Sequence, residues 1–136
     1  MSALDLLLKM DRAKVEELPT KMIELPRLTA LCGEKFEVKL RAVNGEKMAD
    51  IQKGSMSISK KGNVNDLDMY NMQTQMIING MVEPNLKDKT LLDHYGCTTP
   101  KDLIKSLFLA GEISDLFSAI QELSGYEKVN EDEIKK

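Results

Sequence analysis

Residues 66–82 form a strong helical pattern that ends before Pro84 and carries apolar side chains on two faces. At about 100° per residue, one stripe consists of Leu67, Tyr70, Thr74, Ile77, Ile78 and Met81, and the opposite stripe of Met69, Met72 and Met76. A helix that is apolar on both faces is typical of a position between two layers. Alternatively, the three methionines form a docking face, because polarizable Met repacks against varied partners. We favour core packing and keep the methionines as candidate partner-binding residues.

The segment before this helix predicts a β-hairpin. Residues 34–43 alternate as a half-buried strand does, with Phe36, Val38, Leu40 and Ala42 on one face and Glu37, Lys39 and Arg41 on the other. A less regular alternation over residues 20–28 predicts the partner strand. Pro26 within this segment suggests that the partner strand lies at an edge of the sheet, because proline has no backbone N–H to donate to another strand. Cys32-Gly33 is then the connection between the two strands.

The segment between the hairpin and the long helix gives weaker signals. Asn44-Gly45 is a strong turn signal, and residues 46–53 predict a short helix at best. Residues 54–65 are rich in Ser, Gly, Lys and Asn, so we expect a loop or mobile segment there. Within it, two apolar residues alternate with serines, which makes residues 55–60 a candidate third strand.

The N-terminus predicts a helix. Ser2 can cap it, and Asp5 lies in the first turn, where a carboxylate favours the positive end of the helix dipole. Its apolar stripe consists of Leu4, Leu7 and Leu8. Asp11 can cap a second helical segment, and the pattern ends before Pro19.

The C-terminal third predicts three helices separated by glycine and proline signals. Residues 86–95 form a short helix that stops at Gly96. Thr99 and Pro100, a cap followed by proline at the first helical position, open the second. The third begins at Glu112 and shows the i, i+3, i+4, i+7 apolar pattern of a core-facing helix.

These patterns together predict an α+β fold. It has an N-terminal helix, a small antiparallel hairpin or sheet at about residues 20–43 with 55–60 as a candidate addition, and a mainly helical C-terminal half. The length suits one domain, which we expect over residues 1–126. Seven of the last ten residues are charged, so we expect residues 127–136 to be a disordered tail.

Composition excludes several classes of function. The 19 basic and 22 acidic residues give a net charge of -3, which disfavours nucleic-acid binding. No apolar run approaches the ~20 residues of a membrane span, and the N-terminus lacks the basic opening of a signal peptide. Two cysteines are too few for a disulfide framework. We expect an intracellular protein that contacts neither membrane nor nucleic acid.

The sequence offers little chemistry. His94 and Cys97 are the only obvious base and nucleophile, but no oxyanion or substrate motif accompanies them. The same pair supplies too few ligands for a metal ion, and no phosphate-binding or dinucleotide motif occurs. A small thiol enzyme is the least favoured reading. We expect no enzyme, no cofactor, no metal and no catalytic residues.

Several longer stretches of the sequence are more specific than these hydrophobic and turn patterns. They are Val82-Glu-Pro-Asn-Leu-Lys-Asp-Lys-Thr-Leu-Leu92, Tyr95-Gly-Cys-Thr-Thr-Pro-Lys-Asp-Leu-Ile104, Leu107-Phe-Leu-Ala-Gly-Glu-Ile113 and Ile120-Gln-Glu-Leu-Ser-Gly-Tyr126. Together they closely resemble the XkdN-like tail assembly chaperones of phages and phage-like prophage elements. Leu4-Asp-Leu-Leu-Leu8, Ile23-Glu-Leu-Pro-Arg-Leu28 and Phe36-Glu-Val-Lys-Leu-Arg-Ala42 look similar too, so the likeness spans nearly the whole chain.

This resemblance implies a protein that binds rather than catalyses. Members are thought to bind the tape measure protein, a long helical rod, to keep it soluble and to help recruit tail tube protein. They act in the bacterial host cytoplasm and are absent from the mature virion. The alternative is a minor structural protein that remains in the phage tail.

The resemblance also directs attention to particular residues and partners. Besides Met69, Met72 and Met76, the candidate partner-binding residues are Phe108 and Phe117 in the last two helices. Family chaperones are often made in two lengths by ribosomal frameshifting, so a frameshift-extended form of this chain is an expected partner. The sheet edges of so small a protein also invite a homo-oligomer.

Overall fold

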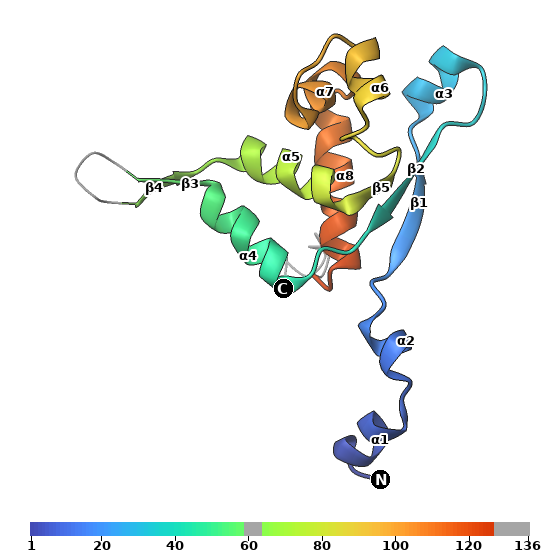
Figure 1. Cartoon of the computed structure of the whole chain (residues 1–136), viewed down its shortest axis with the longest axis vertical. Coiled ribbons are helices and arrows are strands. Elements are labelled where there is room, and N and C mark those ends of the chain that lie inside the picture. The colour runs from blue at the N-terminus through green and yellow to red at the C-terminus, as the bar shows by residue number, and fades with distance from the viewer. Residues whose placement is uncertain (59–63, 127–136) are drawn as a thin grey trace, which may run out of the picture.

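The computed structural model describes residues 1–58 and 64–126. It confirms the α+β fold: a three-stranded antiparallel sheet in the order β1-β2-β5 packs against α5 and α8. Figure 1 shows these helices beside the sheet, with the N-terminal segment extending away from them. The expected single domain over residues 1–126 stays a prediction, and the expected disordered tail at 127–136 lies outside the described residues.

The expected N-terminal helix is present as two short helices. Helix α1 spans Ala3–Lys9, and its cap Ser2 exchanges hydrogen bonds with Asp5. Helix α2 spans Arg12–Glu16 and is capped by Asp11, whose side chain accepts from the backbone N–H of Ala13. No residue of either helix is buried. We refer to residues 1–16 as the N-terminal arm.

The predicted hairpin is confirmed, with one correction. Strands β1 (Thr20–Glu24) and β2 (Glu37–Arg41) pair antiparallel, and β1 lies at the edge as expected. However, Pro26 does not belong to the edge strand, and the connection is more than a turn at Cys32-Gly33. Helix α3 spans Pro26–Cys32, because proline fits the first helical position, and it ends at Gly33 in the left-handed conformation (φ 81°).

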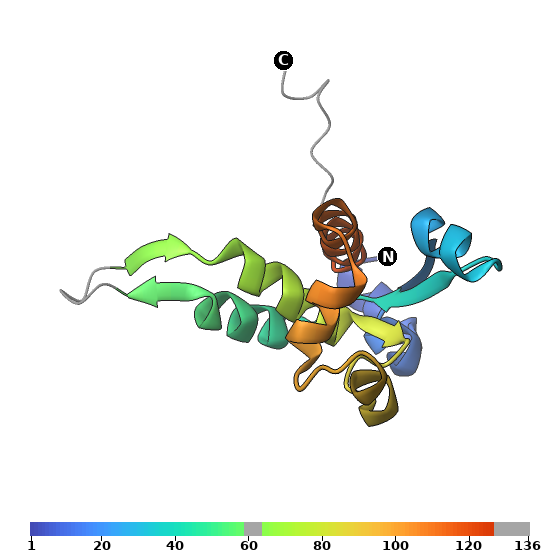
Figure 2. The same ribbon diagram turned by 90° about the horizontal axis from the view of Figure 1, so that it is seen from above.

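The described residues after the hairpin contain more regular secondary structure than the sequence predicts. Helix α4 spans Gly45–Gly54, because Asn44 caps it by accepting from the backbone N–H of Lys47 at 2.8 Å. Strands β3 (Met56–Ile58) and β4 (Val64–Leu67) then form a separate two-stranded hairpin. Figure 2 shows this hairpin extending away from the main sheet. A strand therefore exists within residues 55–60, but it does not join the first hairpin; residues 59–63 lie outside the described residues.

The third strand of the main sheet comes from the end of the predicted long helix. Helix α5 spans Met69–Gly80, shorter than the predicted 66–82, and Met81–Glu83 form β5. Strand β5 pairs antiparallel with β2, with Leu40 opposite Met81 and a shift in register next to it. The helical pattern was misleading here because Met81, the last residue of the predicted stripe, is an apolar residue that is buried as part of a strand.

The C-terminal helices follow their predicted signals. Helix α6 spans Lys89–His94, α7 spans Pro100–Leu107 with Thr99 as its cap, and α8 spans Ala110–Leu123. Glycines 96 and 125 have positive φ, as expected of helix stops. Helix α8 begins at Ala110, two residues before the predicted start at Glu112, and the break before it lies at Phe108–Leu109.

One hydrophobic core joins the sheet to these helices. Its largest fully buried apolar side chains are Val38, Leu40, Met76, Ile77, Leu86, Leu103, Ile104, Leu116 and Ile120. They come from β2, α5, α7, α8 and the segment before α6. Helix α5 contacts α4, α7, α8 and β5, so the expected position between layers is correct.

Candidate partner-binding groove

An apolar groove opens between α3 on one side and α6 with the end of α7 on the other. Its volume is about 390 Å³. The residues that line it are Leu28, Leu31, Cys32, Phe36, Pro84, Leu91, Tyr95, Leu107 and Phe108. Figure 1 shows α3 standing apart from α6 and α7 at one end of the molecule. We call these nine residues the apolar groove.

The first wall of the groove is held by polar contacts around Thr29. Leu28 and Leu31 are three residues apart on α3, so their side chains lie on one face of the helix. The Thr29 hydroxyl accepts from the backbone N–H of Phe36 at 2.9 Å and donates to Glu24 at 2.9 Å. These hydrogen bonds hold Phe36, the residue just before β2, beside α3.

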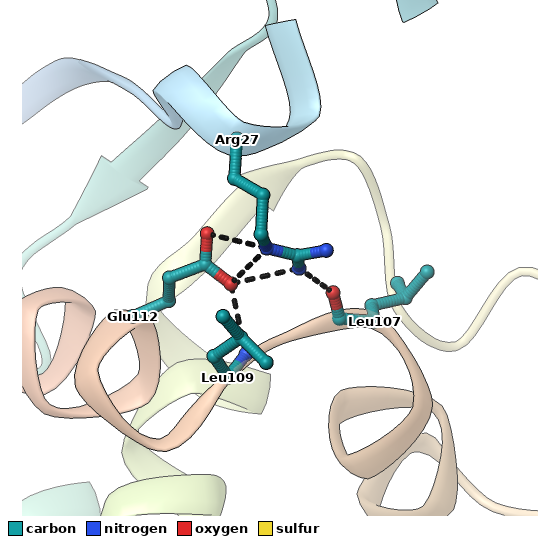
Figure 3. A network of polar contacts seen from close by, with 4 residues as sticks. All are labelled: Arg27, Leu107, Leu109 and Glu112. Carbon is teal, nitrogen blue, oxygen red and sulfur yellow. Dashed lines mark hydrogen bonds and ion pairs between the residues drawn. The ribbon is translucent and has the colours of Figure 1, made fainter. Parts of the chain in front are cut away.

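A charged clasp joins α3 to the start of α8 (Figure 3). The Arg27 guanidinium donates to the Glu112 carboxylate at 2.8 Å and 3.2 Å, and to the carbonyl oxygen of Leu107 at 2.7 Å. The same carboxylate accepts from the backbone N–H of Leu109 at 2.8 Å. Glu112 therefore satisfies a free N–H at the helix start while it anchors α3.

The clasp shifts the pKa values of both its members. The hydrogen bond from Arg27 lowers the pKa of Glu112 below its ordinary value, and the Leu109 N–H acts in the same direction against the opposing effect of burial. The Glu112 carboxylate raises the pKa of Arg27. Both groups therefore stay charged around neutral pH, and the clasp persists there.

The groove combines a packed floor with an exposed rim. Phe108 is buried in the floor, and Leu28, Phe36, Leu91 and Leu107 pack against the core while remaining partly accessible. Leu31 on the rim is 72% exposed. No lining residue carries a charge. Such a concave apolar surface favours the apolar face of another polypeptide over a small polar substrate.

The five candidate partner-binding residues predicted from the sequence lie in different parts of the structure. Met72, Met76 and Phe117 are buried core residues, which agrees with the favoured core reading and not with an exposed methionine docking face. Phe108 lies in the floor of the apolar groove, and only Met69, which is 46% exposed, remains on the surface of α5. Partner binding by any of the five stays a prediction.

Most of the groove residues carry no signal in the sequence that marks them as a site. Leu28, Leu31, Leu91 and Leu107 come from three helices, and no periodic pattern connects them. One signal could have shown part of it: Pro26 at a helix start, followed by two leucines three residues apart, predicts a short apolar helix.

The thiol candidates are not assembled into a catalytic arrangement. The Cys97 sulfur lies 3.6 Å from the Ser106 hydroxyl and 3.5 Å from the Tyr95 carbonyl oxygen. His94 packs edge-on against Tyr95, and within residues 1–58 and 64–126 no hydrogen bond joins it to Cys97. The described residues also hold no group of three or more His, Cys, Asp or Glu placed to bind a metal ion.

No helix in the described part of the chain has the length and apolar character needed to cross a membrane.

An open apolar groove walled by helices is the kind of site that binds a polypeptide. The family model of the phage XkdN-like tail assembly chaperones matches residues 4–136. The chain therefore belongs to this family of tail assembly chaperones.

Among solved structures, the crystal structure of the protein YqbN is similar to this chain. The TM-score is 0.57 at 18% sequence identity, over 79% of this chain and 87% of YqbN. At that identity the likeness concerns the fold alone. A comparison with curated proteins found no significant match.

Proposed function

We propose that this protein binds the tape measure protein of its phage or prophage, keeps it soluble and aids assembly of the tail tube around it. The observation that carries the proposal is the uncharged apolar groove on a member of the tail assembly chaperone family. The protein acts here as a binding partner, and no bond is made or broken.

Physical reasons make the groove a suitable site for such a client. A long helical rod presents apolar stripes that aggregate when they are exposed. The groove can receive one such stripe, because residues at i, i+3 and i+4 of a client helix project from the same face. Phe108 would contact the client from the floor and Leu31 from the rim. Met69 is a second candidate contact, outside the groove.

The remaining parts of the proposal concern the location of the protein in the host cell and its other partners. We place the protein in the bacterial host cytoplasm and expect it to leave before the virion is complete. Tail tube protein and a frameshift-extended form of the chain are further proposed partners. Mass spectrometry of purified virions distinguishes this proposal from a minor structural protein, because only the latter remains in the tail.

Co-expression with the tape measure protein tests the proposal directly. The tape measure protein should be recovered in the soluble fraction together with the chaperone. Leu31→Asp places a charge on the groove rim, so the tape measure protein co-expressed with this variant should be recovered in the pellet. Ala30→Asp is the matched control, because Ala30 is an exposed residue of the same helix that does not line the groove. An unchanged solubility of the tape measure protein in the presence of the wild-type chain contradicts the proposal.

A further inference from the structure

The N-terminal arm presents an apolar helix face that no other residue within 1–58 and 64–126 covers. Leu4, Leu7 and Leu8 form one stripe of α1, and Leu8 is 76% exposed. The capping box at Ser2 and the cap at Asp11 satisfy backbone N–H groups at the starts of the two arm helices. The apolar face of α1 is therefore open to a binding partner.

The arm lies too far from the apolar groove of its own chain to occupy it. Strand β1 separates them, because the arm precedes Thr20 at one end of the strand and α3 follows Glu24 at the other. Figure 1 shows the arm at one end of the molecule and α3, α6 and α7 near the opposite end. Each copy thus carries one uncovered apolar helix and one open apolar groove, pointing in different directions.

We propose that the arm of one copy lies in the apolar groove of a second copy, with Leu4, Leu7 and Leu8 facing Leu28, Leu31 and Leu91. When two copies exchange arms, the same two surfaces are used on both and the assembly closes as a dimer. Each copy contributes one arm and one groove, so the exchanged dimer contains two identical arm–groove contacts.

Charge does not oppose this pairing. The arm's three basic side chains, Lys9, Arg12 and Lys14, balance three acidic ones, Asp5, Asp11 and Glu16. The groove lining is uncharged. Association is therefore driven by apolar burial and depends only weakly on salt.

The exchange goes beyond the proposed function and is tested without the tape measure protein. If both hold, the arm covers the groove until a client helix displaces it, which protects the apolar surface from aggregation. Failure of the exchange would leave client binding untouched, because the client experiment reads solubility of the tape measure protein and not the copy number of the chaperone.

The first experiment measures the molecular mass of the full chain by sedimentation equilibrium. The wild-type chain should be a dimer. Leu7→Asp should raise the dimer dissociation constant at least about tenfold, because a charge would enter the groove. Leu6→Asp is the matched control, since Leu6 lies on the opposite face of α1 and should leave the dimer intact. A wild-type monomer, or equal effects of the two variants, overturns the proposal.

The second experiment tests the groove side. Leu31→Asp should also give monomers, and Ala30→Asp should not. Mixing the Leu7→Asp and Leu31→Asp variants should restore dimers, because the first retains an intact groove and the second an intact arm. If Leu31→Asp remains dimeric, the arms pair with each other and the proposal is wrong.

Cross-linking identifies the contact itself. Cys32 lines the groove and is exposed, so Leu8→Cys should form a disulfide with Cys32 of a second copy under mild oxidation. The expected product is a covalent dimer that disappears when Cys32→Ser is added. A disulfide within one chain, or a dimer that persists after Cys32→Ser, contradicts the exchange.

Discussion

Gly80, at the end of α5, lies directly against the side chain of Ile120 on α8. A Cβ atom at position 80 would come within 2.7 Å of Ile120 Cδ1 and 2.9 Å of Ile120 Cγ2, closer than carbon atoms normally approach. Ile120 is fully buried, so it has little room to move. The missing side chain of Gly80 therefore sets how closely the two central helices pack.

Replacing Gly80 should consequently destabilise the protein. We expect Gly80→Ala to lower the free energy of unfolding by about 1–3 kcal/mol, as overpacking of a filled core does. Urea denaturation followed by circular dichroism measures this. Gly111→Ala is the control, because Gly111 lies in α8 with open space around it and a change to Ala there should be neutral or stabilise by about 0.5 kcal/mol. Equal effects at both positions would disprove the close-packing argument.

The Arg27–Glu112 clasp should contribute measurably to stability. Glu112→Ala removes both the ion pair and the acceptor for the Leu109 N–H, and we expect a loss of about 1–2 kcal/mol in the free energy of unfolding. Glu112→Gln keeps an acceptor at the helix start and loses only the charge. Because Arg27 is 36% exposed and solvent screens the pair, this variant should lose only about 0.5 kcal/mol. Chemical denaturation of both variants measures the difference, and a larger loss for Gln than for Ala would contradict the assigned roles.

The stability difference between wild type and Glu112→Gln should depend on pH. The folded-state pKa of Glu112 is lowered, mainly by the Arg27 hydrogen bond. A carboxyl group with a lowered folded pKa stabilises the protein above its unfolded pKa, and this stabilisation is lost as the pH falls through the folded value. The difference should thus be full at pH 7 and shrink towards zero in acid, where Glu112 is neutral like Gln. Urea unfolding at a series of pH values tests this, and a constant difference would disprove it.

The methionines of α5 should respond very differently to the same substitution. Met76 is fully buried, so Met76→Ser should cost about 3 kcal/mol or more through lost burial and a cavity. Met69 is 46% exposed, and Met69→Ser should stay within about 0.5 kcal/mol of wild type. Thermal unfolding of the two variants provides the comparison. If Met69→Ser weakens recovery of soluble tape measure protein without loss of stability, Met69 contacts the client.

The main error in the predicted fold concerns β5. Met81 continues the apolar stripe of α5 and Val82 is also apolar, so a local pattern cannot distinguish another turn of helix from a strand. Pairing with β2 decides the matter, because the backbone groups beside Lys39 and Leu40 find partners only in a strand. These residues lie about forty positions earlier in the chain, beyond the reach of any local signal.

The groove was beyond prediction for a similar reason. Its walls come from α3, α6 and α7, and the clasp joins Arg27 to a residue 85 positions away. Of the nine groove residues, only Phe108 was among the predicted partner-binding residues, and it was selected as part of the last two helices rather than as part of a groove.

Local signals in the sequence are enough to place several helix ends, because caps such as Ser2 and Thr99 and stops such as Gly96 act within a few residues. They do not determine which apolar faces are covered. Helix α1 and helix α8 carry the same i, i+3, i+4 spacing of apolar residues, yet the stripe of α8 is core and that of α1 is exposed. Coverage follows from the tertiary structure, because burial depends on which elements distant in the chain pack against a face, and among the residues that the structure describes none packs against the arm.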